Sequence, residues 1–108
     1  MRVRNIHAAS EWFEVLQTSK NSQTAVMILN PGQSSGDSAE AHRHSEQTLL
    51  VVTGHVEGEV ENETLSLQPG DVITVSEGMR HRFWNKGTQA AVTFNVYAPP
   101  EYRDGAKG

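Results

Sequence analysis

The sequence predicts an all-β domain, a small antiparallel β-barrel or jelly roll, and two observations support this prediction. Short runs of Val, Leu, Ile and Phe alternate with turn residues along most of the chain, which is typical of sandwiches and barrels. Helical periodicity is almost absent, and about eight short strands account for the runs. The 108 residues suffice for one domain, so we expect a single domain over residues 1–108, with the barrel core at about 24–98 and a loose tail at about 99–108.

Each predicted strand ends at turn residues. Residues 25–29 form the first clear strand, which a turn at residues 30–32 ends. Residues 12–16 fit either a brief helix capped by Ser10 or an edge strand, and the local sequence does not choose between them. A two-residue hairpin turn is expected at residues 61–62. Further strands are expected at residues 47–53, 55–60, 63–67, 72–75, 81–84 and 91–97.

Composition and charge exclude several classes of protein. Nine Lys and Arg against 13 Asp and Glu give a net charge of −4, so neither a nucleic acid nor an anionic membrane is an expected partner. The chain has no cysteine, which excludes disulfides, thiolate-bound zinc, iron–sulfur clusters and thiol catalysis. The longest apolar run, residues 49–52, is far shorter than the roughly 20 residues that span a bilayer. No apolar stretch follows the basic residues at the N-terminus, so we expect a cytoplasmic protein.

Three of the five histidines, His42, His44 and His81, are candidate site residues. Side chains two apart in a strand face the same way, so Glu40, His42 and His44 would project into one cavity. Imidazole, amide and carboxylate groups together suit a divalent transition metal, Fe, Mn, Ni, Cu or Zn. The alternative is that two histidines fall two residues apart by chance and lie at the solvated end of a strand. Spacing alone does not decide between these two interpretations.

Two motifs surround these histidines. The first comprises Gly36, the run His42-Arg43-His44, Gln47 and Gly54. The second comprises Gly70, the run Ser76-Glu77-Gly78, His81 and Asn85. In this order, with a Pro-Gly-Asp turn between them, they resemble the two motifs of the cupin superfamily, although Ser76 stands where the family usually has proline. The resemblance extends over about residues 30–85 and implies a metal-binding barrel.

The resemblance implies four metal ligands, and His42, Gln47 and His81 belong to both possible alignments of the first motif. Gln47 stands where the family usually has glutamate, and it would serve as a neutral oxygen ligand. Only two residues separate His44 from Gln47, a short gap for the family, and the other alignment places Glu40 and His42 in the His-x-His positions. A two-residue loop pairing His44 with Gln47 lacks the Gly or Asn that tight hairpins favour. Three imidazoles suit a late transition metal better than two, so His44 is the preferred fourth ligand and Glu40 the alternative.

Phe83 follows His81 by two positions on the same predicted strand, so it should face the same interior as core or as the wall of a substrate pocket. Trp84 should face outward, where an exposed aromatic ring favours a dimer surface. Residues 97–101 match the Tyr-x-Pro-Pro-Glu tail of small cupins that carry a Glu-x-His and Gln pattern. Further core positions are expected at Met27, Leu49, Val51, Phe94 and Val96.

The resemblance implies a small metal-binding cupin, an enzyme of the dioxygenase or a related oxidoreductase class that acts on a small organic molecule. Because a fold does not by itself specify a function, the alternative is a non-catalytic module that binds or senses a small molecule. Acid–base candidates are few, Glu40 being the main one if it is not a ligand, which favours metal-centred chemistry. The resemblance also implies a homodimer, since small cupins commonly pair through edge strands or sheets.

Overall fold

The computed structural model describes residues 2–36 and 39–102, which contain eight strands and one short 3₁₀ helix. In chain order these are η1 (Ile6–Ala8), β1 (Phe13–Thr18), β2 (Gln23–Leu29), β3 (Glu46–Thr53), β4 (Val56–Val60), β5 (Glu63–Leu67), β6 (Val72–Val75), β7 (His81–Trp84) and β8 (Ala91–Ala98). Residues 12–16, which the sequence left open, therefore contribute to an edge strand. The predicted bounds of the other strands differ from the observed ones by two residues at most.

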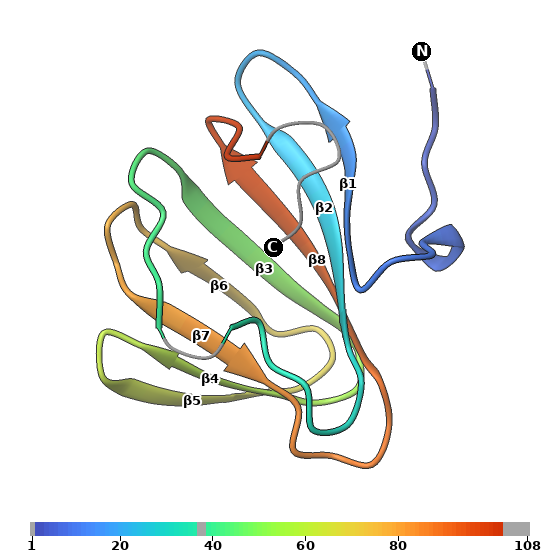
Figure 1. Ribbon diagram of the computed structural model, residues 1–108, viewed down its shortest axis with the longest axis vertical. Coiled ribbons are helices and arrows are strands. Elements are labelled where there is room, and N and C mark those ends of the chain that lie inside the picture. Colours follow the sequence, from blue (N-terminus) through green and yellow to red (C-terminus); the bar gives the residue numbers. More distant parts are fainter. Residues whose placement is uncertain (1, 37–38, 103–108) are drawn as a thin grey trace.

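The strands form two antiparallel sheets that face each other (Figure 1). One sheet has five strands in the order β1-β2-β8-β3-β6, and the other has three in the order β5-β4-β7. Within the described residues the two sheets are not joined into one closed ladder. The predicted all-β jelly-roll class is confirmed, in the form of an open two-sheet sandwich.

The predicted hairpin turn lies between β4 and β5. Glu61 and Asn62 have φ values of 47° and 70°, the left-handed conformation that a two-residue hairpin loop requires at both central positions. Asn adopts this conformation at low cost because its short side chain bonds locally. The strands on either side pair in direct continuation of the turn, from Val60 with Glu63 onward.

Gly54 makes the turn from the five-stranded sheet into β4, and its place admits no side chain. Its φ is +80°, and a Cβ added there would lie 2.6 Å from the Ala91 Cα and 2.7 Å from the Ala90 carbonyl oxygen. Both of these neighbours are main-chain atoms, which cannot move aside cheaply. The end of β3 therefore packs against the start of β8 only because residue 54 is glycine.

The Gly54→Ala variant should lower the free energy of unfolding by about 2–4 kcal/mol, because it combines left-handed strain with a steric clash. Gly70→Ala is the matched control, since Gly70 has a φ of +94° but nothing within 4 Å of an added Cβ. That control should cost only the conformational strain, about 1 kcal/mol. Thermal and urea unfolding of the two variants measures both values, and equal losses would contradict the clash.

The interior between the sheets is apolar at its centre. Met27, Leu49 and Val51 are buried there as predicted. Phe94 and Val96 were expected in the core, and that prediction is wrong, because they lie half-buried on the outer face of β8. The interior face of β8 carries Ala91, Thr93, Asn95 and Tyr97 instead. Alternation along a strand defines two faces, but the more apolar face is not necessarily the inner one.

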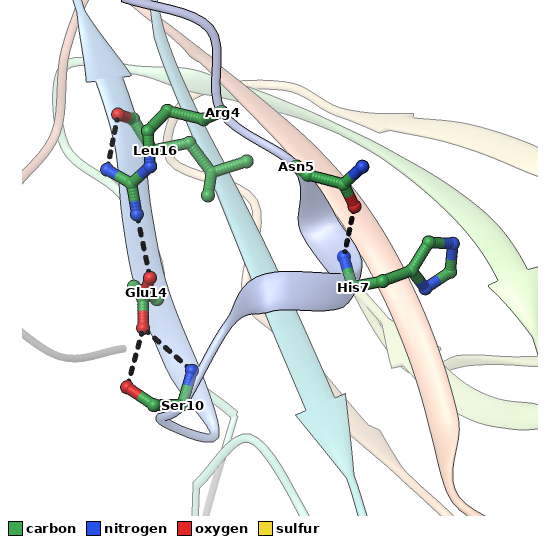
Figure 2. Close-up of polar contacts among 6 residues, drawn as sticks. All are labelled: Arg4, Asn5, His7, Ser10, Glu14 and Leu16. Atoms are coloured by element: carbon green, nitrogen blue, oxygen red, sulfur yellow. Dashed lines mark hydrogen bonds and ion pairs between the residues drawn. The ribbon is translucent and has the colours of Figure 1, made fainter.

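The segment before β1 runs beside this edge strand and is fastened to it (Figure 2). The Arg4 guanidinium contacts the Glu14 carboxylate at 2.8 Å and donates to the Leu16 carbonyl at 3.1 Å. The Ser10 amide donates to the same carboxylate at 3.1 Å, and the Asn5 side chain accepts from the His7 amide, which caps η1. These contacts attach the N-terminal segment to an edge strand that would otherwise be open to pairing.

Candidate functional site

A cavity of about 40 Å³ opens between the sheets, and most of the predicted site residues meet there. This volume holds a few water-sized groups. Its walls combine imidazole, amide, carboxylate and hydroxyl groups with aromatic rings and one thioether. The lining residues are Phe13, Met27, Ser35, Gly36, Glu40, His42, Gln47, His81, Phe83, Tyr97 and Tyr102.

His42, Gln47 and His81 therefore lie around one cavity, with Glu40 and Phe83 also in its wall. His44 does not line it, and its side chain is exposed. The expectation that Glu40, His42 and His44 share one face of a strand is wrong, because residues 41–45 form no strand. Glu40 makes an isolated bridge with His81, and the chain then leaves the sheet in a bend that turns His44 outward.

His81 is held by β7 and by a bond to the main chain. Its Nδ1 lies 3.1 Å from the Met79 carbonyl oxygen, so this nitrogen carries the proton. Burial lowers the pKa of His81 below its usual 6.5, and the nearby His42 acts in the same direction. A neutral ring with the proton on Nδ1 leaves a lone pair on Nε2, which is the form in which histidine binds a metal.

Gln47 extends from β3 into the cavity and is held by a side chain of the neighbouring strand β8. Its Nε2 donates to the Asn95 Oδ1 at 2.9 Å, and its Oε1 lies 3.1 Å from the His42 Nε2. The side chain is almost fully buried, with 3% of its surface exposed. Its oxygen is therefore the amide atom that contacts His42.

His42 is placed by side-chain contacts on both of its ring nitrogens. Its Nδ1 lies 3.3 Å from the Glu101 Oε2, while Nε2 faces the Gln47 oxygen. Its ring centre is 4.8 Å from that of His81. With its proton on Nε2, His42 donates to the Gln47 oxygen; with its proton on Nδ1, directed to Glu101, it presents the Nε2 lone pair beside that oxygen, as it would toward a shared metal.

This pair of atoms fits a transition metal. Ligand atoms at adjacent corners of a six-coordinate ion, with bonds of about 2.1 Å, are about 3.0 Å apart. The observed separation of 3.1 Å between Nε2 and Oε1 is close to that value, and it is also an ordinary hydrogen-bond distance, so the two side chains can bond each other without a metal and share one when it binds. Within residues 2–36 and 39–102, no three His, Asp or Glu side chains gather closely enough to hold a metal between them. A metal site here would therefore depend on the amide oxygen of Gln47.

Sequence reasoning missed the C-terminal contribution to the site. Residues 99–102 are not loose, because Gln23 clamps them from within β2. The Gln23 Nε2 donates to the Tyr102 carbonyl at 2.7 Å, and its Oε1 accepts from the Glu101 and Tyr102 amides at 3.1 and 2.8 Å. The remainder of the expected tail lies outside the described residues. The Tyr-x-Pro-Pro-Glu match was the sequence signal for this segment, and it did not specify these contacts.

Tyr97 and Tyr102 bring two hydroxyl groups to the cavity. Their ring centres lie 5.0 Å apart in an edge-to-face arrangement. Burial raises the pKa of Tyr102 to about 12, and burial, followed by the adjacent Tyr102, raises the pKa of Tyr97 well above its usual 10. Both hydroxyls therefore remain protonated at neutral pH. A hydrogen bond joins them, in which Tyr97 donates to Tyr102, so the Tyr102 proton is the one left to donate elsewhere.

Comparison with known proteins gives the family. The family described as cupin domain matches residues 25–97, about two-thirds of the sequence. The chain belongs to the cupin family. Among solved structures, this cupin is similar to a protein of Bacillus halodurans, with 21% identity, coverage of 94% of this chain and 80% of that one, and a TM-score of 0.86. It is also similar to a Thermus thermophilus protein, with 21% identity, coverage of 92% and 98%, and a TM-score of 0.81.

Two further similarities carry functional names. A Thermotoga maritima protein described as a predicted oxalate decarboxylase has 23% identity, coverage of 73% of this cupin and 67% of that chain, and a TM-score of 0.67. Polyketide synthase CurC of Streptomyces cyaneus is 34% identical over 64 residues, which are 59% of this cupin. The cupin spans only 40% of the length of that relative. The solved structures show the shared fold. Among the described residues, no helix has the length and apolar character needed to cross a membrane.

Replacing Gln23 by alanine should release the segment 99–102 from the cavity, because three hydrogen bonds end on that one side chain. We expect the free energy of unfolding to fall by about 1–3 kcal/mol. Hydrogen exchange at the Glu101 and Tyr102 amides should accelerate at least tenfold, which corresponds to about 1.4 kcal/mol of local opening. Gln89→Ala, at an exposed position, is the control. Unchanged exchange at both amides in Gln23→Ala would contradict the clamp.

Proposed function

We propose that this cupin binds a divalent transition metal through the Nε2 atoms of His42 and His81 and the Oε1 atom of Gln47. Glu40, in the cavity wall, replaces His44 as the proposed fourth ligand. In the described residues it does not cluster with the two histidines, so binding requires its side chain to turn toward them. The observation that carries the proposal is the 3.1 Å approach of the His42 Nε2 to the Gln47 Oε1. Other partners hold the remaining polar groups of these two side chains, so both ligand atoms are directed to the cavity.

The donor set suits Fe, Mn, Ni, Cu or Zn, since imidazole and amide or carboxylate oxygen are common ligands of all five. When bound, such an ion would supply Lewis-acid or redox chemistry. We propose an enzyme of the dioxygenase or a related oxidoreductase class. The fold similarity to a protein described as a predicted oxalate decarboxylase is compatible with metal-centred chemistry on a small molecule.

The proposed substrate is a small organic molecule with an oxygen-bearing group at its reacting end. A cavity of about 40 Å³ admits only a few atoms. The rings of Phe13 and Phe83 form an apolar wall, while the protonated hydroxyl of Tyr102, which accepts from Tyr97, can donate to a substrate oxygen. The similarity to a protein named polyketide synthase supports an organic molecule of this kind.

Two residues beside the proposed ligands have roles in this arrangement. Phe83, with 1% of its surface exposed, would exclude water from the cavity. Glu101 would orient the ring of His42 by accepting from its Nδ1, as carboxylates do for metal-binding histidines. Glu40 and Glu101 are the carboxylates near the cavity, and both have other tasks in this arrangement. Because a cupin fold does not by itself specify turnover, a non-catalytic ligand-binding module is kept as the second candidate.

Removing the metal ligands one at a time separates the two possible ligand sets. His81→Ala should lower the affinity for added Co²⁺ by about 100-fold or more, beyond the 10–100-fold that loss of an outer partner costs. Glu40→Gln should weaken binding by at least about tenfold if its carboxylate is a ligand. His44→Ala, the matched control at an exposed histidine, should bind as the parent chain does.

Calorimetric titration and elemental analysis measure these affinities on protein purified without chelator or nickel resin. Circular dichroism verifies that each variant is folded. Full metal occupancy in His81→Ala would contradict the metal site. A weakened His44→Ala beside an unaffected Glu40→Gln would restore the other ligand set. Stoichiometric metal with no turnover on any small carboxylic or enolic compound would favour the ligand-binding module over the enzyme.

We also propose that the chain forms a homodimer through the outer face of the five-stranded sheet. Half-buried apolar side chains from three adjacent strands adjoin there, because Phe94 pairs with Leu50 and Val92 pairs with Ile28. Val26, which also pairs with Phe94, is already fully buried. An apolar sheet face of this kind marks a protein interface. Trp84, the dimer contact expected from sequence, is half-buried, with Arg82 and Lys86 over its ring.

Phe94→Glu should convert the dimer to a monomer, because it places a charge at the centre of this apolar face. Val3→Glu is the control, since Val3 is apolar and 90% exposed on the N-terminal segment. Multi-angle light scattering over a range of protein concentrations gives the mass of each variant. A parent chain that remains monomeric at high concentration would contradict the dimer, and a dimeric Phe94→Glu would contradict the choice of face.

A further inference from the structure

Three buried polar side chains form a chain of hydrogen bonds from the cavity to the main chain of β2. Gln47 donates to Asn95 at 2.9 Å, Asn95 donates to the Thr93 hydroxyl at 3.0 Å, and that hydroxyl donates to the Met27 carbonyl at 3.0 Å. Asn95 and Thr93 have no exposed surface, and 3% of Gln47 is exposed. In the described residues, every buried side-chain nitrogen or oxygen has a hydrogen-bond partner.

The direction of every bond in this chain follows from the main-chain end. The Met27 carbonyl can only accept, so the single hydroxyl proton of Thr93 is directed to it. Thr93 can then only accept from Asn95, which must present its NH₂ group. The Thr93 carbonyl, 3.5 Å from the same nitrogen, imposes the same orientation, because a carbonyl also only accepts.

The orientation of Gln47 follows in turn. With its NH₂ directed at Thr93, Asn95 presents an oxygen to Gln47. Gln47 must therefore donate to this oxygen from its own NH₂ group. Its oxygen then faces the His42 Nε2. The reversed amide would place two oxygens against each other in the interior, where an unsatisfied polar contact costs about 1–3 kcal/mol.

We propose that Thr93 and Asn95 are positioning residues that fix the amide of Gln47, so that the cavity presents an oxygen and selects a cation. A reversed amide would present an NH₂ group, which repels a cation and donates to an anion or to His42. The same two histidines and one glutamine would then form an anion-binding or hydrogen-bonding pocket. This inference rests on the proposed metal site, and it assigns the selectivity of that site to residues outside its ligand set.

The test compares Thr93→Val with Thr93→Ser. Valine has nearly the shape of threonine but no hydroxyl, so Asn95 keeps only its longer 3.5 Å contact to the main-chain carbonyl of residue 93, and both amides are held less firmly. Serine keeps the hydroxyl and removes only a methyl group. Thr93→Val should bind Co²⁺ about tenfold more weakly than the parent chain, within the range known for outer partners of metal ligands. Thr93→Ser should bind within about twofold of the parent chain.

Amide orientation has a readout that does not depend on metal. In ¹⁵N-labelled, chelator-treated protein, the side-chain NH₂ of Gln47 should show stronger nuclear Overhauser contacts to Asn95 than to the His42 ring. Thr93→Val should strengthen the contacts from this NH₂ to the ring, and Thr93→Ser should not. Thermal unfolding of all three proteins separates these effects from a loss of fold.

The outcomes distinguish the two proposals. Parent-like Co²⁺ binding and parent-like contacts in Thr93→Val would overturn the positioning role. Weak binding in Thr93→Ser as well as Thr93→Val would also overturn it, because the hydroxyl would then not be the cause. A parent chain that takes up no Co²⁺ overturns the proposed metal site and, with it, the selection of a cation. The Overhauser contacts still decide whether Thr93 orients the amide.

Discussion

The site depends on one constraint, that polar side chains buried on the interior face of β8 must be hydrogen-bonded. β8 is the middle strand of its sheet and pairs with β2 on one side and β3 on the other. This pairing places Thr93 opposite Met27 and Tyr97 opposite Gln47. A shift of one residue would send the polar face outward and the apolar face inward. The register of the sheet and the direction of the Gln47 amide are therefore two consequences of the same pairing.

The remaining parts of the site are attached to this sheet by segments that are not strands. The loop that carries His42 is held by main-chain bonds, in which Glu40 and His81 exchange both amide and carbonyl at 3.0 and 2.8 Å, and Gly78 donates to the His42 carbonyl at 2.7 Å. The segment after β8 is held by Gln23. His42 thus lies between two attached segments, one on each side of its ring.

Polar interiors limit how stable a small sandwich can be. A chain of this length buries only about 60–65% of its unfolded surface, and here part of that interior is occupied by histidine, glutamine, asparagine and threonine. The apolar centre around Leu49, Val51 and Val56 must supply the stability that the site does not. Burial also keeps His81 neutral and the tyrosines protonated, so the same environment that reduces the apolar core prepares the groups around the cavity.

The sequence by itself determined the features that depend on neighbouring residues. The strands, the hairpin at Glu61 and Asn62, and the inward positions of Gln47, His81 and Phe83 follow from turn chemistry, alternation and motif spacing. Tertiary structure decided which face of β8 is interior, because alternation is identical for Phe94 and for Asn95 until a second sheet covers one of them. It also decided that Glu40 and not His44 borders the cavity, because side chains alternate between two faces only in a strand, and residues 41–45 form a bend. The approach of Glu101 to His42 depends on Gln23, which lies 78 residues away in sequence from Glu101, a contact that local sequence does not encode.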